Sequence, residues 1–413
     1  MSSSQYDYAL TLSSQFYFCG LPLRLDSYSR CTFNCLYCFA NARGGNRGKQ
    51  PIRQADVSSL ARRFNRLDRE PPQSVIDEFL RRRQPIHFGG MSDPFIPLEL
   101  QRKVSLEILK VLADHRYPTV VSTKSDLLAR DEYLAVLKRG NFLIQVSLSS
   151  TDDRLIATTD LGVPGPSRLL EMLRILSHEG IPTACRVQPI LPTREKDVIG
   201  VIDECAAAGV RHIAVEHLKL PIETAWTGTQ QLSKVLGVNL PKYYGEVGAK
   251  RVGREWILPS AEKLGRVLEF RSHCHKKGVT FGAADNDLLL LSDGACCCSG
   301  ADFLPRFEGF FRHNYLEAVR RGLLKEYISF CDISETWCPQ GSIAMYVNSN
   351  SRISSTNGVG GGIDKYLARN WNGSLNGNSP LMFYGVADSG MVDLDGFKLY
   401  QASREIKSLV FDN

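Results

Sequence analysis

The sequence predicts an α/β fold: a partial (β/α)6 TIM-like barrel with a cysteine-containing C-terminal extension. Over the first 220 residues, short apolar runs alternate with stretches of helical periodicity, which is typical of repeated βα units and a parallel sheet. Apolar residues make up 43% of the chain and charged residues 23%, so we expect a globular protein with a packed core rather than a disordered or fibrous chain.

The expected strands are the short apolar runs. In chain order they lie near 22–28, 85–89, 117–123, 142–149, 181–190 and 212–219. Helices are expected between them, near 72–83, 98–114, 130–139, 166–179 and 195–208. The stretch 166–179 shows the helical spacing clearly, because Leu169, Met172, Leu173 and Leu176 share one face. Six such units predict the partial barrel.

The pattern changes after residue 220. Scattered Gly, Pro, Trp and Tyr over 221–259 indicate an insertion or linker rather than a seventh unit. Helical periodicity returns at 260–277, and a strand is expected at 279–284. The predicted organisation is therefore a barrel at 1–220, an insertion or linker at 221–259 and an extension at 260–413.

The cellular location is inferred from what the sequence lacks. No run of about 18 apolar residues occurs, and the first residues carry neither a basic nor an apolar stretch. We therefore expect no membrane span, no membrane partner and no secretory signal, and we expect a cytoplasmic protein. In a reducing compartment the twelve cysteines are thiolates available for metal, or buried thiols.

Three cysteines near the N-terminus carry the strongest chemical signal. Cys31, Cys35 and Cys38 follow the spacing C-x3-C-x2-C. A short loop with this spacing can curl around an iron–sulfur cubane, and three thiolates are one fewer than a saturated cluster needs, so one iron keeps a free site. The alternative is a zinc site with a fourth ligand elsewhere, such as His87.

In this position, ahead of βα repeats, the run C-T-F-N-C-L-Y-C resembles the radical S-adenosylmethionine (SAM) superfamily. Five further segments narrow the resemblance to its branch of spore-photoproduct-lyase-like, or DNA repair photolyase-like, proteins. They lie at 89–99, 122–131, 146–153, 162–170 and 179–192. The resemblance implies a [4Fe–4S] cluster on Cys31, Cys35 and Cys38 whose open iron binds S-adenosyl-L-methionine. An electron, from a donor such as flavodoxin or ferredoxin, then cleaves the cofactor to a 5′-deoxyadenosyl radical that abstracts hydrogen.

The resemblance also assigns cofactor contacts at the ends of predicted strands, where barrel active sites are built. Gly89 and Gly90 form the turn at the methionine amino group, Ser92 contacts the cofactor, and Lys124 pairs with the methionine carboxylate. Ser147 lies near the ribose, and Asp93, Phe39 and Arg186 complete the set of cofactor-binding candidates. Other readings remain open, because Ser92 and Asp93 could cap the following helix and Lys124 could be a surface charge.

Two departures separate the chain from the photoproduct lyase reaction itself. The hydrogen-donor cysteine of that enzyme would fall at Gly90, and a tyrosine of its radical relay would fall at Phe39. Tyr37 keeps a matching phenol and is a catalytic candidate. We infer that the scaffold and the cofactor chemistry carry over, whereas dimer repair does not.

Five cysteines cluster in the C-terminal extension. Cys296, Cys297, Cys298, Cys331 and Cys338 could hold a second iron–sulfur cluster or zinc, or could be buried apolar residues. Adjacent cysteines do not all reach one metal from a regular strand, because successive side chains point to opposite faces. Cys298 is also a candidate hydrogen donor to a substrate radical.

Polar residues on the last two predicted strands are candidates for the substrate pocket. Arg186, Gln188, Glu216 and His217 interrupt apolar runs, and polar groups inside βα strands need partners. Either these side chains line a substrate pocket, or they form their hydrogen bonds with other residues of the fold.

The charge distribution bears on the substrate. Between 43 and 83 there are eleven basic residues against five acidic ones, which indicates either a solvated helix face or a surface for a polyanion. The first functional hypothesis is radical repair or modification of a nucleic-acid base. The alternatives are radical modification of a peptide or small metabolite with an auxiliary cluster, and a non-catalytic metal-binding module.

Overall fold

The computed structural model describes residues 9–12, 19–21, 23–42, 51–223, 227–294, 298–305, 315–334, 368–373 and 379–411. An eight-stranded sheet with the order β1-β2-β4-β5-β6-β8-β9-β13 forms its centre. The strands are β1 (Leu10–Leu12), β2 (Leu23–Leu25), β4 (Ile86–Phe88), β5 (Thr119–Thr123), β6 (Phe142–Ser147), β8 (Thr183–Ile190), β9 (His212–His217) and β13 (Thr280–Ala283). Only β1 is antiparallel to its neighbour. The predicted α/β class with a mainly parallel sheet is confirmed.

The parallel sheet is longer than the six expected units. Helix α12 (Ser260–Lys276) returns the chain to the edge of the sheet, where β13 pairs in parallel with β9. A parallel neighbour requires such a crossover connection. Residues 260–284, which the sequence assigned to the extension, therefore continue the sheet. At its other edge β1, which the sequence did not predict, has only three residues.

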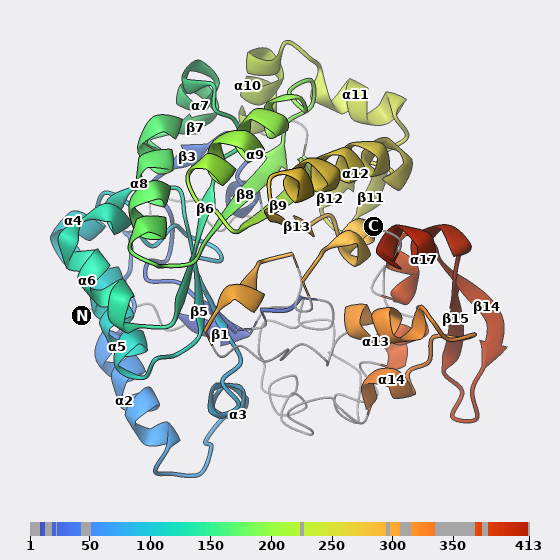
Figure 1. The fold of residues 1–413 in the computed structure, drawn as a ribbon, viewed down its shortest axis with the longest axis horizontal. Coiled ribbons are helices and arrows are strands. Elements are labelled where there is room, and N and C mark those ends of the chain that lie inside the picture. Colours follow the sequence, from blue (N-terminus) through green and yellow to red (C-terminus); the bar gives the residue numbers. More distant parts are fainter. Residues whose placement is uncertain are drawn as a thin grey trace.

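Helices cover the outer face of the sheet (Figure 1). They include α2 (Val57–Leu67), α3 (Val75–Arg81), α5 (Val104–Asp114), α6 (Asp131–Arg139), α8 (Pro166–His178) and α9 (Asp197–Ala207). The helix expected at 98–114 is split into α4 (Glu99–Arg102) and α5, because Lys103 adopts a left-handed conformation with φ of 54°. Helices α2 and α7 (Asp153–Thr159) were not predicted.

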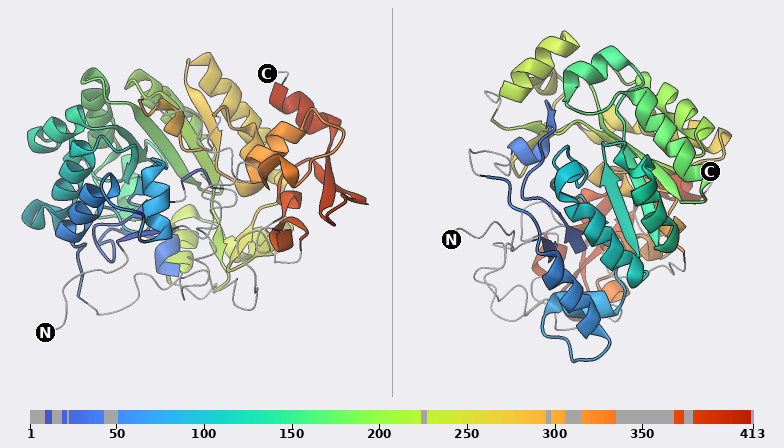
Figure 2. Two further views of the ribbon diagram at one scale, coloured as in Figure 1. Left: turned by 90° about the horizontal axis from the view of Figure 1, so that it is seen from below. Right: turned by 90° about the vertical axis from the view of Figure 1, so that its left-hand side faces the viewer.

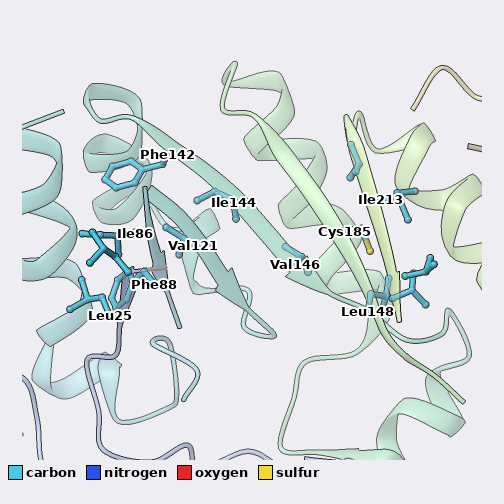
Figure 3. Packing of buried hydrophobic residues seen from close by; sticks show 14 of the residues in the cluster. Leu25, Ile86, Phe88, Val121, Phe142, Ile144, Val146, Leu148, Cys185 and Ile213 are labelled. Atoms are coloured by element: carbon cyan, nitrogen blue, oxygen red, sulfur yellow. The ribbon is translucent and has the colours of Figure 1, made fainter. Parts of the chain in front are cut away.

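Strand β6 separates two apolar layers. Phe142, Ile144 and Val146 alternate along it and belong to the large cluster between sheet and helices (Figure 3). The residue between them, Leu143, joins a second cluster with residues of neighbouring strands and of a C-terminal segment, namely Val120, Ala184, Ala301 and Leu304. The face of the sheet away from the helices is thus partly covered by residues 298–304.

The predicted insertion is folded. It contains β10 (Leu220–Pro221), α10 (Thr227–Leu236), α11 (Leu240–Glu246), β11 (Lys250–Val252) and β12 (Glu255–Ile257), and its three strands form a separate antiparallel sheet. Leu240 and Tyr244 of α11 anchor its own apolar cluster against Leu218 and Leu220. No helix in the described part of the chain is both long and apolar enough to span a membrane.

The C-terminal segments pack at the end of the molecule opposite α4 and α6 (Figures 1 and 2). They comprise the 3₁₀ helices η2 (Asn286–Leu291) and η5 (Pro380–Met382), and also α13 (Tyr315–Gly322), α14 (Cys331–Ser334), β14 (Val386–Val392), β15 (Lys398–Ala402) and α17 (Arg404–Phe411). The 3₁₀ helix η3 (Ala301–Phe303) lies apart from them, on the face of the central sheet. Trp371 is fully buried there against Tyr315, Phe330 and Tyr400. This aromatic cluster gives the segments a core of their own.

Candidate active site

The three-cysteine loop is fixed by an antiparallel contact far along the sequence. It contains β3 (Asn34–Cys35) and is followed by α1 (Phe39–Ala42). Strand β3 pairs with β7 (Asp160–Leu161), which places Cys35 opposite Asp160. Burial raises the pKa of Cys31 to about 12, and it raises that of Cys35 well above its usual range. The charges of Lys124, which lowers it, and of Asp160, Cys38 and Cys31, which raise it, also act on the pKa of Cys35.

This donor set fits an iron–sulfur cubane better than a single ion. Backbone N–H groups of Phe33 and Asp93 donate to the Cys31 sulfur, as is common around cluster ligands. Among the described residues, no three His, Cys, Asp or Glu side chains converge on one metal ion. A cubane needs no such convergence, because each thiolate binds a different iron. The zinc alternative with His87 gains no support, since the His87 Nε2 atom lies 2.7 Å from the Ser122 hydroxyl.

The turn after β4 is held by its neighbours. Gly89 has φ of 94°, and a Cβ atom there would collide with the Ser122 carbonyl oxygen, so only glycine fits. Asp26, at the end of β2, accepts hydrogen bonds from the backbone N–H groups of Met91 (2.8 Å) and Ser92 (3.2 Å). The Ser92 hydroxyl donates to the Tyr28 carbonyl at 2.6 Å. Ser92 is therefore bonded within the fold, and its cofactor contact stays a prediction.

Asp93 joins three segments of the site. Its carboxylate accepts hydrogen bonds from the Phe95 N–H (2.8 Å), the Thr123 hydroxyl (2.9 Å) and the Lys124 N–H (2.6 Å). Burial raises the pKa of this carboxyl group despite these bonds. Because its own N–H points at Cys31, Asp93 connects the cysteine loop to the end of β5. The geometry makes Asp93 a positioning residue.

Lys124 is half-buried in a network with Tyr37 and Asp160. Its ammonium lies 2.7 Å from an Asp160 carboxylate oxygen and 2.9 Å from the Tyr37 hydroxyl, and Tyr37 also donates to Asp160. Burial alone would lower the pKa of Lys124, but the Asp160 carboxylate outweighs it and raises the pKa well above its usual value. The surface-charge reading of Lys124 is therefore wrong. Sequence reasoning missed Asp160, because it reaches the site only through the pairing of β3 with β7.

The sheet face opposite the helices carries two rows of polar side chains. In the first, the Ser122 hydroxyl lies beside His87 and donates to the Gln145 side chain at 2.9 Å, and Gln145 donates to the Ser299 carbonyl at 3.2 Å. The second row, nearer the carboxyl ends of the strands, consists of Ser147, Arg186 and Gln188, each partly exposed. The sheet register sets Ser147 beside Arg186.

Two other pocket candidates are paired within the fold. Glu216 forms an ion pair with Lys219. His217 lies with its Nδ1 atom 2.8 Å from Asp285, and the buried Lys263 of α12 lies 3.3 Å from the same carboxylate. These contacts join β9, β13 and α12, so we assign both residues a structural role.

The C-terminal cysteines do not share the contacts of the first loop. Cys298 offers its carbonyl to His212 at 3.0 Å, at the amino end of β9, whereas the three-cysteine loop contacts Asp160 and the end of β5. Cys331 is exposed beside Ser329. Cys296, Cys297 and Cys338 lie outside the described residues. The second metal site and the hydrogen-donor role of Cys298 thus stay predictions without support from the described residues.

The basic segment 43–83 falls largely on α2 and α3. Arg63 and Arg66 form ion pairs with the buried Asp77, so part of the basic excess is structural. Arg62 is 71% exposed, and Arg69 and Arg82 are exposed too. Arg43, Arg47 and Lys49 lie outside the described residues. Phe39, the first residue of α1, is 42% exposed.

Comparisons with known proteins agree with this geometry. Residues 26–205 match the family described as the radical SAM superfamily. No curated protein sequence matches the chain.

Three solved structures of spore photoproduct lyase have a similar fold. A cysteine-to-serine mutant has 14% identity and a TM-score of 0.51 over 65% of this chain and 77% of that one. A tyrosine-to-phenylalanine mutant has 15% identity and a TM-score of 0.52, over 67% and 79%. The enzyme complexed with dinucleoside spore photoproduct has 14% identity and a TM-score of 0.50, over the same shares. At these identities the likeness establishes the fold alone.

Proposed function

We propose that this chain, a radical SAM superfamily enzyme, acts on a base in nucleic acid, as a repair or modification enzyme. The observation that carries the enzymatic part is the loop of Cys31, Cys35 and Cys38, which offers three partly or fully buried cysteines beside the end of β5 in a mainly parallel sheet. These residues would hold a [4Fe–4S] cluster. When bound, that cluster supplies the electron that cleaves S-adenosyl-L-methionine to a 5′-deoxyadenosyl radical.

The residues around the loop have separable tasks in this proposal. Asp26 and Asp93 hold the turn at Gly89 to Ser92 in one conformation. Asp160 holds the Lys124 ammonium at the edge of the site, where it would meet the cofactor's carboxylate. Preorganisation of this kind reduces the free-energy cost of binding. Tyr37 is itself a residue of the cysteine loop, and its hydroxyl contacts both Lys124 and Asp160.

Two observations support a nucleic-acid substrate. Spore photoproduct lyase, which shares the fold, has been solved with a dinucleoside photoproduct. In addition, Arg62, Arg69 and Arg82 are exposed on or beside α2 and α3, where they could contact phosphates. Gly90 and Phe39 replace the thiol and one phenol that the lyase reaction would require, so we propose a different transformation of a base. A radical SAM enzyme needs a reductant, and we propose a flavodoxin or ferredoxin.

The test measures 5′-deoxyadenosine. The chain would be reconstituted with iron and sulfide under anaerobic conditions, reduced with dithionite and supplied with the cofactor. We expect 5′-deoxyadenosine from wild type and none from Cys35→Ala, and we expect an oligonucleotide to stimulate its formation. Because phosphate contacts release counterions, this stimulation should fall steeply between about 50 and 200 mM salt. Stimulation by a peptide mixture instead of the oligonucleotide would refute the substrate class but not the enzyme class.

A further inference from the structure

The folded insertion packs on the three-cysteine loop. Leu36, the residue after Cys35, is 6% exposed and belongs to the same apolar cluster as Leu240 and Tyr244 of α11. Tyr37 packs against this cluster as well. Figure 1 shows α10 and α11 at the end of the molecule that also holds β3 and β7. The apolar side of the loop is therefore covered by a segment far along the chain.

This cover lies outside the part of the chain that matches the superfamily. The match ends at residue 205, whereas α10 begins at Thr227. Helix α10 also contacts α7, the helix that leads into β7 and so to Asp160 opposite Cys35. The insertion thus gives the cysteine loop a contact that the matched region does not supply.

The three cysteines differ in how far they are enclosed. Cys35 is buried, whereas Cys31 and Cys38 are partly exposed. The Leu36 N–H donates to the Thr159 carbonyl at 2.8 Å, so the backbone beyond Cys35 is fixed to the end of α7. The Cys35 side of the loop is therefore held by α7 and β7 on one side and by the insertion on the other.

An apolar cover on one side of a metal site has two physical effects. It holds the ligand-bearing backbone in one conformation, so less entropy is lost when the metal binds. It also keeps water away, and the apolar shell around a metal centre helps to set its reduction potential. Water stabilises the added negative charge of a reduced cluster, so a shielded cluster is harder to reduce. An apolar insertion against the loop therefore favours a firmly held cluster of low potential.

We propose that the insertion at 221–259 seats the cysteine loop and shields the side of the site at Cys35. Leu240 and Tyr244 are its positioning residues, because they are 0% and 2% exposed within the cluster that buries Leu36. This role rests on the proposed function only in that the three cysteines bind the iron–sulfur cluster, and it is independent of the substrate class.

Amide hydrogen exchange of the metal-free chain tests the seating alone. Leu240→Ala leaves a cavity in the insertion, and the amides of residues 33–38 should then exchange about tenfold faster or more, as measured by mass spectrometry. Leu240→Met keeps the volume of the side chain and should retain the wild-type exchange. Leu316→Ala is the matched control, because Leu316 is 1% exposed on α13, away from β3 in Figure 1. It should lower the thermal unfolding midpoint without changing this exchange.

Two measurements on the reconstituted protein test the shielding. Iron should pass to an added chelator about tenfold faster from Leu240→Ala than from wild type, because the surroundings of the metal ligands are disturbed. The midpoint potential of its cluster, followed by electron paramagnetic resonance during a reductive titration, should be more positive than in wild type. Leu240→Met and Leu316→Ala should match wild type in both measurements.

The comparison with Leu316→Ala decides the outcome. Loop exchange, iron release and midpoint potential in Leu240→Ala that equal those of Leu316→Ala would overturn the proposed role of the insertion. If Leu240→Ala does not fold, Leu240→Val, which leaves a smaller cavity, takes its place in the same comparisons. A wild-type chain that binds no iron would count against the cysteine assignment alone, because exchange in the metal-free chain still tests the seating.

Discussion

Three carboxylates arrange the residues of the candidate site. Asp26 fixes the turn after β4, Asp93 connects that turn to the end of β5 and to Cys31, and Asp160 holds Lys124 beside Tyr37. Asp26 and Asp160 are each 1% exposed, and burial raises the pKa of Asp26 and of Asp93. Each of the three carboxylates accepts hydrogen bonds from two or more donors. Buried charges are stable only when they are paired and hydrogen-bonded, so these contacts fix the geometry around the loop.

Replacement of Asp160 by Asn should destabilise the fold. It would leave the Lys124 ammonium, whose side chain is 16% exposed, without its counterion. Loss of one partner of a buried ion pair costs about 3–5 kcal/mol, and the lower end applies here because Tyr37 remains as a partner. Denaturant unfolding of the metal-free chain measures the loss.

The double variant Asp160→Asn/Lys124→Met provides the control for that measurement. If the loss comes from the unpaired ammonium, the double variant should recover a large part of the stability lost by Asp160→Asn alone. The single variant Lys124→Met completes the comparison. If the stability lost by the double variant equals the sum of the losses in the two single variants, Asp160 stabilises the fold through contacts other than its ion pair with Lys124.

The sequence predicted the residues at strand ends but not those that depend on distant pairing. The alternation of apolar runs placed Lys124 at the end of β5 and Arg186 within β8, and both are found there. Asp160 could not be found in this way, because β3 and β7 are two residues long and carry no periodicity. The partner of His217 was missed for a different reason. The strand that precedes Asp285 was expected at 279–284, but it was assigned to the extension and not to the sheet that contains His217.

At the scale of elements, α12, β9 and β13 are joined by a buried ionic cluster. Asp285 follows β13 and contacts both His217 at the end of β9 and Lys263 on α12. Burial would raise the pKa of Asp285, but the Lys263 ammonium and the His217 hydrogen bond hold it well below its usual value. The cluster therefore attaches the last parallel strand to its crossover helix.

This depressed pKa predicts a pH-dependent contribution to stability. Because the carboxyl group has a lower pKa in the folded than in the unfolded state, where it is about 3.9, its contribution is present above that pH and is lost as the pH falls further. Wild type should exceed Asp285→Asn in free energy of unfolding at pH 7, and the gap should narrow below about pH 4. Denaturant titrations of both metal-free chains from pH 3 to pH 7 measure this gap. A gap that is constant across the range would contradict the ionic explanation.

The segment at 298–304 depends on close approach to β13. A Cβ atom on Gly282 would lie 2.6 Å from the Cys298 carbonyl oxygen and 2.8 Å from His212 Nε2. Gly282→Ala should therefore displace this segment and cost about 1–3 kcal/mol, with faster hydrogen exchange of its amides. Gly265→Ala is the matched control, because nothing lies within 4 Å of the added atom and alanine favours the α12 helix. Equal stability of Gly282→Ala and Gly265→Ala would show that residues 298–304 can move away from β13 without a loss in the free energy of unfolding.

At the scale of the whole molecule, the two ends of the parallel sheet carry different segments. The three-cysteine loop lies at the carboxyl ends, where barrel enzymes build their sites, and the segment with Cys298 lies at the amino end of β9. The C-terminal elements pack beside the sheet around Trp371 (Figure 2). Neither the folded insertion nor this aromatic core was predicted, because their short elements show little periodicity in the sequence.

The most direct test of the account is a count of iron and sulfide per chain after anaerobic reconstitution. Wild type would be compared with the triple variant Cys31→Ala, Cys35→Ala, Cys38→Ala. We expect about four irons and four sulfides in wild type, as one [4Fe–4S] cluster requires, and none in the variant. A variant that still holds about four irons would contradict the central claim that Cys31, Cys35 and Cys38 form the cluster site, and it would place a cluster on the C-terminal cysteines instead.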